Sequence, residues 1–170
     1  MNLYLNQQAV LGVTSASLII TFLASFLIWF MFAGLIILWF VDGRVKKEQA
    51  IHAFAAALLA WVIAEMLKSL LPSVRPFLIN GELPLTITFP SNNAFPSSHT
   101  AIAFSLAVTL WLHNKKVGVV YLTLAFLVAI GRVYANVHYI LDVVIGGMIG
   151  IMVAVVIDKL HLFRLLKIKK

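Results

Sequence analysis

The stretch from Thr14 to Val41, TSASLIITFLASFLIWFMFAGLIILWFV, contains no charged residue. A helix needs roughly 20 apolar residues to cross the hydrocarbon core of a bilayer, and this stretch exceeds that length. The rest of the chain has the same character, because 62% of the 170 residues are hydrophobic and only 11% are charged. Soluble domains carry about a quarter charged residues. The composition therefore excludes a soluble domain, a disordered chain and a free-standing nucleic-acid-binding module, in spite of the net charge of +7.

Four further apolar segments follow, at residues 50–71, 98–113, 117–130 and 140–157, and short polar connections separate them. The first segment, taken as residues 9–40, is long enough for one tilted helix after a short interfacial helix, or for two tightly packed short spans. No repeat marks a second domain. We therefore expect an all-α polytopic membrane helix bundle with five or six transmembrane helices, formed by residues 1–170 as a single domain.

The basic residues predict how the bundle is oriented. Ten of the 13 Lys and Arg residues fall on one side when the spans alternate across the membrane. The positive-inside rule assigns that side, and with it the C-terminus, to the cytoplasm. Residues 1–12 lack the basic segment of a cleavable signal peptide, so we expect the first span to be retained in the plasma membrane. The ten residues are Arg44, Lys46, Lys47, Lys115, Lys116, Lys159, Arg164, Lys167, Lys169 and Lys170.

The other three basic residues, Lys68, Arg75 and Arg132, fall at the opposite, extracytoplasmic face. A cation close to the membrane interior is costly and indicates a functional site. The three belong to polar groups at residues 68–76, 95–100 and 131–142. Two spans separate the second group from the third, so both lie on the same side. The sequence therefore predicts one polar site at that face.

These polar groups suit an anion such as phosphate. Ser97 is expected to cap a helix that starts after Pro96, so that the backbone N–H groups of Ser98 and His99 point outward toward an anion. Guanidinium groups offer planar forks for phosphate oxygens, and a lysine ammonium supplies a compact charge. The predicted phosphate-binding residues are Lys68, Arg75, Ser97, Ser98 and Arg132.

Two histidines and an aspartate supply the candidate catalytic groups. His138 and Asp142 are four residues apart, which places them on one helix face. Asp142 is then positioned to accept the Nδ1–H of His138, leaving Nε2 free to attack. His99 comes from another helix and suits general acid catalysis on a leaving oxygen. Zinc is the competing ligand for such a set, but three cations in the same place would repel a divalent metal, so no metal or cofactor is expected.

The three polar groups resemble the signature motifs of the type 2 phosphatidic acid phosphatase superfamily, which read K-x6-RP, PSGH and SR-x5-H-x3-D. The resemblance extends over about residues 50–157. Two positions depart from the motifs, because Ser98 replaces a glycine and Gly131 replaces a serine. The matching residues are Lys68, Arg75 and Pro76 in the first motif, Pro96, Ser97 and His99 in the second, and Arg132, His138 and Asp142 in the third.

The resemblance implies a metal-independent membrane phosphatase. By the family pattern, His138 is the nucleophile that becomes phosphohistidine, and Asp142 orients it. His99 protonates the leaving group and then activates the water that hydrolyses the intermediate. The same pattern has Lys68, Arg75, Ser97 and Arg132 hold the phosphate, together with the backbone amides before His99.

The resemblance also implies a lipid phosphate in the bilayer as substrate. Small bacterial members commonly act on undecaprenyl diphosphate, phosphatidylglycerol phosphate, phosphatidic acid or lipid A phosphates. The compact length and outward-facing site resemble those of undecaprenyl diphosphate phosphatases, so the expected reaction yields undecaprenyl phosphate and phosphate. A phosphatase for one of the other three lipids is the alternative, and an anion or lipid transporter is a more remote one. No nucleic acid and no obligatory protein partner is expected.

Two features outside the motifs carry further expectations. Glu65 lies one helical turn before Lys68, and we expect it either to pair with Lys68 or to make a polar contact between helices. Gly146 and Gly150 are spaced for close helix packing. We expect that packing within one chain rather than between two copies.

Overall fold

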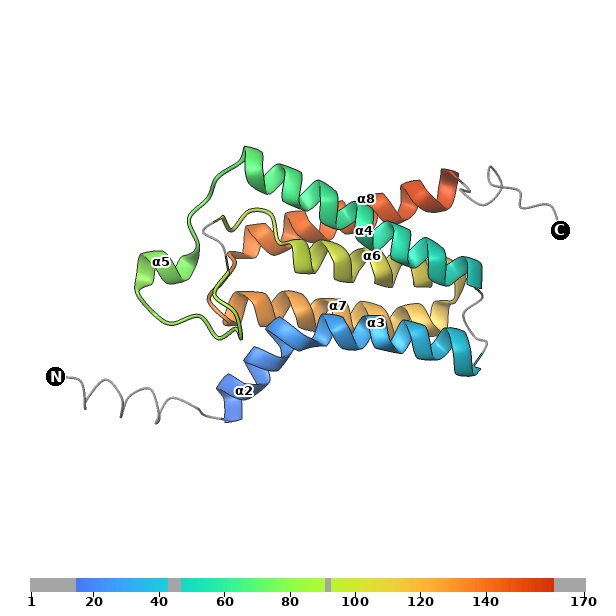
Figure 1. Cartoon of the computed structure of the whole chain (residues 1–170), viewed down its shortest axis with the longest axis horizontal. Coiled ribbons are helices and arrows are strands. Elements are labelled where there is room, and N and C mark those ends of the chain that lie inside the picture. The colour runs from blue at the N-terminus through green and yellow to red at the C-terminus, as the bar shows by residue number, and fades with distance from the viewer. Residues whose placement is uncertain (1–14, 43–46, 91–92, 161–170) are drawn as a thin grey trace.

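A computed structural model gives the structure of residues 15–42, 47–90 and 93–160 (Figure 1). These residues form helices and connecting loops, and no β-strand occurs among them beyond one isolated bridge between Val74 and Asn93. The all-α prediction is therefore confirmed. The elements are α2 (Ser15–Thr21), η1 (Phe22–Phe26), α3 (Leu27–Ile37), η2 (Leu38–Asp42), α4 (Lys47–Leu70), α5 (Pro76–Asn80), α6 (Ser98–His113), α7 (Lys115–Tyr134) and α8 (Ile140–Leu160).

Four helical segments are long and apolar enough to cross a membrane: Ser15–Phe40, Lys47–Leu70, Lys115–Tyr134 and Ile140–Leu160. A fifth segment, α6, has 16 residues and a length of about 24 Å. The run from α2 to η2 is a single span, so the alternative of two short spans within it is wrong for the described residues. The interfacial helix expected before this run lies outside the described residues.

The first span bends between α2 and α3, as Figure 1 shows, and the bend lies at the π-helical segment η1. Insertion of a π-helical turn is a recognised cause of helix kinks. The bend brings η1 against the C-terminal end of α7. There Gly131 packs so closely that a Cβ would overlap the backbone of Leu23 and Ala24. Packing therefore explains why Gly131 stands where the superfamily motif has a serine.

Small residues bring the helices at the centre of the bundle together. The buried face of α4 consists largely of alanines, which allow close approach of α6 and α8. A Cβ at Gly146 would overlap the carbonyl oxygen of Ser97, and one at Gly150 would overlap that of Ala101. The expected packing of the two glycines within one chain is confirmed. The buried alanines of α4 are Ala50, Ala53, Ala56, Ala57, Ala60 and Ala64.

Successive helices alternate in direction, so the bundle has two distinct ends (Figure 1). One end contains the start of α4, the α6–α7 junction and the end of α8. The predicted segregation of charge is confirmed for the described residues, because Lys47, Lys115, Lys116 and Lys159 lie at that end while Lys68, Arg75 and Arg132 lie at the other. The remaining six basic residues, Arg44, Lys46, Arg164, Lys167, Lys169 and Lys170, lie outside the described residues.

Candidate active site

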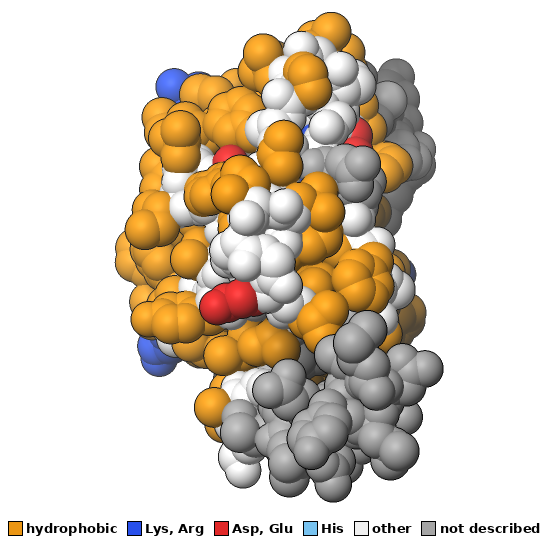
Figure 2. Space-filling view, turned by 90° about the vertical axis from the view of Figure 1, so that its left-hand side faces the viewer, with side chains coloured by type: hydrophobic (Ala, Val, Ile, Leu, Met, Phe, Trp, Pro, Cys, Tyr) orange, Lys and Arg blue, Asp and Glu red, His pale blue; other side chains and the backbone are white. Residues whose placement is uncertain are grey.

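A cavity of about 380 Å³ opens at the end of the bundle where α4 and α7 finish and α6 begins. Basic side chains cover little of the surface at this end (Figure 2), because Arg75 and Arg132 are only 3% and 5% exposed. Six of the eight site residues predicted from the sequence line this cavity. They are Lys68, Arg75, Ser98, His99, Arg132 and His138.

The imidazole of His138 occupies the centre of the basic groups. Its Nε2 lies 3.4 Å from Nη1 of Arg75 and 3.4 Å from Nη2 of Arg132. A guanidinium group has only donors, so Nε2 must be the unprotonated nitrogen that faces them. The proton then resides on Nδ1, which lies 3.4 Å from Oδ2 of Asp142. This arrangement makes Nε2 the unprotonated nitrogen of a ring that lines the cavity.

Asp142 does not line the cavity but lies directly behind His138. Its side chain is buried, and Oδ2 accepts the backbone N–H of Tyr139 at 2.8 Å. The contact with His138 is somewhat longer than an ordinary hydrogen bond, as is common in catalytic groups before substrate binds. The i, i+4 spacing read from the sequence thus places the carboxylate where it orients the ring.

Ser97 also lies behind the cavity wall. Its backbone N–H donates to the backbone carbonyl of Asp142 at 3.0 Å, and its hydroxyl accepts from Oγ1 of Thr100 at 3.0 Å. Ser97 occupies the N-cap position of α6, but its side chain makes no capping hydrogen bond. The predicted side-chain cap is therefore wrong, because the Thr100 hydroxyl engages the Ser97 oxygen and packing holds the residue fully buried. Through the hydrogen bond from its backbone N–H to Asp142, Ser97 connects the second motif to the third.

Ser98 links Lys68 to Glu65. The ammonium of Lys68 donates to Oε1 of Glu65 at 2.8 Å and to Oγ of Ser98 at 2.6 Å. The hydroxyl of Ser98 in turn donates to Oε1 of Glu65 at 2.5 Å. The expected pairing of Glu65 with Lys68 is confirmed. Ser98, which departs from the family motif, thus provides a hydroxyl that helps to hold the lysine at the cavity.

Arg132 has a donor left for a ligand. Its Nη1 donates to the backbone carbonyl of Ala24 at 2.9 Å, which fixes the guanidinium against the first span. Its Nε is buried and has no hydrogen-bond partner among the described residues. Buried polar groups in folded proteins are nearly always satisfied. This donor is therefore an exception within the described part of the site.

Hydrogen bonds between loops hold Arg75 and the start of α6 together. The hydroxyl of Ser73 accepts the backbone N–H groups of Ala94 at 3.1 Å and Phe95 at 2.7 Å. Nη1 of Arg75 donates to the carbonyl of Val137 at 2.8 Å. Hydrogen bonds between side chains and backbone groups therefore fix segments of all three motifs to one another, although they are far apart in the sequence.

Burial shifts the pKa of the two titratable site residues that lie in loops. It lowers the pKa of the Arg75 guanidinium, while the charges of Asp142 and Glu65 oppose the shift. Burial also lowers the pKa of His138 well below its ordinary value, with Arg132 and Arg75 acting in the same direction and Asp142 in the opposite one. At neutral pH the His138 imidazole is therefore uncharged.

Several cavity residues escaped the sequence analysis. Trp29 comes from the first span, outside the motifs, and Thr86, Thr88 and Pro90 come from the loop between α5 and α6. Trp61 lines the cavity from α4, two helical turns before Lys68. Their only sequence signal is a polar or aromatic side chain in an otherwise aliphatic segment or loop. That signal does not identify which of many such residues meet at one place.

A metal fits this donor set poorly. Among residues 15–42, 47–90 and 93–160, no three His, Cys, Asp or Glu side chains form a metal-binding group. Nε2 of His138 faces two guanidinium groups, which compete with a cation for that position. The arrangement suits an anion.

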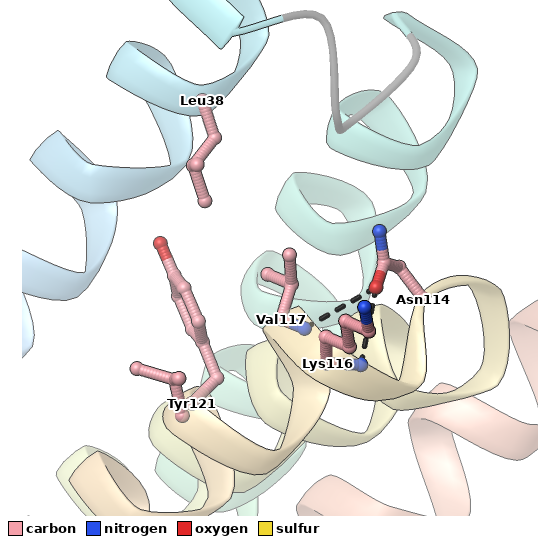
Figure 3. A pocket seen from close by; sticks show the side chains of 6 residues that line it. Leu38, Asn114, Lys116, Val117 and Tyr121 are labelled. Carbon is pink, nitrogen blue, oxygen red and sulfur yellow. Dashed lines mark hydrogen bonds between the residues drawn. The ribbon is translucent and has the colours of Figure 1, made fainter.

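A larger cavity, of about 580 Å³, lies at the opposite end of the bundle (Figure 3). Leu38, Val117, Val120 and Tyr121 form most of its wall, and Lys116 is the charged residue that lines it. The side chain of Asn114 accepts the backbone N–H groups of the first turn of α7, which caps that helix. This cavity lacks convergent charged groups, so its size alone does not make it a catalytic site.

Known proteins resemble this chain in both sequence and fold. The bacitracin transport permease protein BcrC of Bacillus licheniformis is 32% identical over 136 residues, which cover 80% of this chain and 67% of that protein. An undecaprenyl-diphosphatase of Sulfolobus acidocaldarius is 28% identical over 124 residues, which cover 72% of this chain and 58% of that protein. The crystal structure of Aquifex aeolicus LpxE matches with a TM-score of 0.72 and 28% identity, over 89% of this chain and 92% of LpxE.

The family model of the PAP2 superfamily matches residues 49–165. This region includes all three motifs and every helix from α4 to α8 except the first residues of α4. The match covers more than half of the chain, and the fold agrees with that of LpxE. This multi-pass membrane protein belongs to the PAP2 superfamily.

Proposed function

We propose that the protein is a metal-independent lipid phosphatase that works through a phosphohistidine at His138. One observation carries the proposal: an uncharged imidazole nitrogen faces a cavity between two buried guanidinium groups, with a carboxylate behind the ring. A nucleophile, its orienting group and a cationic phosphate site are the parts that phosphoryl transfer to a side chain requires.

In the first step, Nε2 of His138 attacks the terminal phosphorus of the lipid phosphate. A P–N bond forms and the P–O bond to the lipid breaks, and His99 donates a proton to the departing oxygen. Arg75, Arg132 and Lys68 stabilise the charge on the phosphate oxygens. Since fixed cations already supply this stabilisation, the reaction needs no metal ion.

In the second step, His99 accepts a proton from water as the water oxygen attacks the phosphohistidine. The P–N bond breaks, inorganic phosphate leaves, and the imidazole of His138 is restored. Asp142 stabilises the positive charge on the ring while the phosphate is attached. Both steps use only groups that line the cavity or lie directly behind it.

Undecaprenyl diphosphate is the substrate we favour. The name of the Sulfolobus acidocaldarius relative supports this choice. Phosphatidylglycerol phosphate, phosphatidic acid and lipid A phosphates are the alternatives, since the motifs recognise the phosphate and not the lipid attached to it. The permease name of the Bacillus licheniformis relative raises transport of a lipid or anion as a further alternative.

Phosphate release by the purified protein, in the presence of a chelator, tests the proposal. We expect hydrolysis of undecaprenyl diphosphate and slower hydrolysis of the three alternative lipids. Acid-labile radioactive phosphate should appear on the protein during turnover and map to His138. Transport into proteoliposomes without phosphate release would contradict the proposal, as would activity that a divalent ion restores after chelation.

We also propose that the active site faces away from the cytoplasm in the plasma membrane, with the C-terminus on the cytoplasmic side. The position of Lys47, Lys115, Lys116 and Lys159 at the opposite end supports this orientation. The chain has no cysteine, so single cysteines introduced by Glu82→Cys and Lys116→Cys report on the two ends. In intact cells, a membrane-impermeant thiol reagent should label the first variant and not the second. The reverse pattern would contradict this orientation.

A further inference from the structure

An apolar groove adjoins the active-site cavity. It has a volume of about 360 Å³ and lies between α3 and α4, over α6. Two of its residues, Trp61 and Ile102, also line the active-site cavity, so the two spaces share a wall. We call this space the α3–α4 groove. Its lining residues are Phe32, Phe54, Ala57, Leu58, Trp61 and Ile102.

The same three helices line the groove and the active site. On α3, Phe32 lies one helical turn from Trp29 of the active site. On α6, Ile102 is three residues beyond His99, and on α4 the groove runs from Trp61 back to Phe54. Two turns of α4 correspond to about 10 Å. The groove therefore leads from the phosphate site along the bundle toward its other end.

Two stacked aromatic rings lie at the far end of the groove, and its outer side is exposed. The rings of Phe32 and Phe54 stack across it, with their centroids 5.6 Å apart. On the outer side, Leu58 is 61% exposed and Trp61 is 45% exposed, on a bundle surface that faces lipid. A hydrocarbon chain in the bilayer thus has lateral access to the groove.

We propose that the α3–α4 groove binds the first part of a single hydrocarbon chain of the substrate, while the phosphate occupies the active-site cavity. This proposal rests on the proposed lipid phosphatase function. The groove has no charged residue in its wall and adjoins the phosphate site through Trp61 and Ile102, as a substrate with a polar head and an apolar tail requires. One narrow groove, about two helical turns long, accommodates one chain, which favours a prenyl phosphate over a lipid with two acyl chains.

In lipid, a groove of this kind acts through packing, because the surrounding bilayer is as apolar as the groove itself. Its contribution is to orient the substrate, so that the phosphorus lies in line with Nε2 of His138. Filling the groove should therefore slow the hydrolysis of long-chain substrates. It should not affect the hydrolysis of short substrates that reach no further than Trp61.

Groove-filling substitutions test the proposal on the full chain in vesicles. Leu58→Trp and Leu58→Phe each add bulk at an exposed position of the groove and do not disturb the core. For each variant we expect kcat/KM for farnesyl diphosphate to fall about ten-fold or more, the size typical of a hydrophobic pocket that no longer fits its ligand. For dimethylallyl diphosphate, we expect a change of less than about two-fold.

Val120→Trp is the matched control, at an exposed position of the cavity at the opposite end (Figure 3). It should leave kcat/KM unchanged for both farnesyl diphosphate and dimethylallyl diphosphate. Equal losses for the long and short substrates would overturn the proposal, and so would unchanged turnover of farnesyl diphosphate. Hydrolysis of a two-chain phosphatidic acid with the same sensitivity to Leu58→Trp would overturn the preference for a single chain.

Photolabelling tests the groove without turnover. A farnesyl phosphonate with a diazirine at the end of its chain, photolysed in the same vesicles, should label residues 54–61 of α4. Labelling there without phosphate release from any lipid would support the groove and contradict the proposed phosphatase function. Phosphate release with labelling only on other helices would support the function and overturn the groove.

Discussion

Each end of the bundle contains a cavity, and the charged and titratable side chains gather around the smaller one. At the α6–α7 junction, a space of about 580 Å³ is walled by Leu38, Val117 and Tyr121, with Lys116 as its charged residue (Figure 3). At the other end, a space of about 380 Å³ is surrounded by three cations and two histidines. Volume therefore does not locate the site in this protein. The convergence of buried charged groups does.

The two ends also differ in how their cations are held. Lys115 and Lys116 are exposed at the α6–α7 junction, where topology and attraction to anionic lipid account for them. Arg75 and Arg132 are buried, and each donates to a backbone carbonyl on a different segment of the chain. Burying a charge is expensive unless it is hydrogen-bonded. Among the residues that the structure describes, buried arginines therefore occur at the end that contains the candidate site, which is typical of a functional site.

Substitution of His138 should reduce phosphate release far more than any substitution at the cavity of the opposite end. His138→Ala removes the proposed nucleophile, so we expect phosphate release to fall by about 10⁴-fold or more and no phosphoenzyme to form with any substrate. Lys116→Ala, at the other cavity, should leave release within about two-fold of the unchanged protein. Radioactive phosphate trapped on His99 instead of His138 would reverse the assignment of the two histidines.

His99→Ala should have a smaller effect that depends on the leaving group. With a lipid monophosphate such as phosphatidic acid, the departing group is an alcohol whose oxygen needs a proton, so phosphate release should fall by about 10² to 10⁴-fold. With undecaprenyl diphosphate, the departing group is a phosphate monoester, so the loss should be smaller. A synthetic ester that departs readily as an anion should be less impaired in the first step. The phosphohistidine should then accumulate, because activation of water is lost as well. Equal losses for both leaving groups would show that His99 is not the acid.

Sequence reasoning succeeds where function is carried by residue type and spacing. The apolar stretch at residues 14–41 is sufficient to predict a membrane helix, and six of the eight predicted site residues line one cavity. The spacing of His138 and Asp142 also predicts that the two side chains lie side by side, because four residues correspond to about one turn of a helix.

The same reasoning misses what depends on packing between distant segments. Nothing in the sequence of the first span indicates that a π-helical bend brings Ala24 to Arg132, or that Trp29 reaches the cavity. Gly131 reads as a lost hydroxyl, whereas close contact with Leu23 leaves no room for a side chain. The hydroxyl of Ser97 is directed to Thr100 and not to the helix end, a choice between two nearby donors that spacing alone does not decide.

The pH dependence should distinguish the buried site from an exposed one. Because burial lowers the pKa of His138, the nucleophile stays uncharged below pH 6.5, and activity is lost only when the pH falls through the lowered value. Arg75→Gln removes a charge that lowers this pKa, so the acid limb of kcat/KM should move to higher pH. Arg75→Lys retains the positive charge, so the pH at which kcat/KM falls on the acid side should not change. Ionisation of the substrate phosphate is the same for all variants, so an unchanged limb in Arg75→Gln would contradict the assignment.

The smallest effect should come from Ser98→Gly, which restores the residue of the family motif. The hydroxyl contacts both Lys68 and Glu65, so its loss should raise KM about five-fold by loosening the ammonium. Ser69→Ala is the matched control, since that hydroxyl donates to a backbone carbonyl outside the cavity. In a Glu65→Gln background, Ser98→Gly should cost little more, because residues in one hydrogen-bonded network give non-additive losses. Additive losses in this double-mutant cycle would show that Ser98 and Glu65 do not position Lys68 together. The effect of Ser98→Gly would then have to come from how closely the backbone at residue 98 approaches the phosphate.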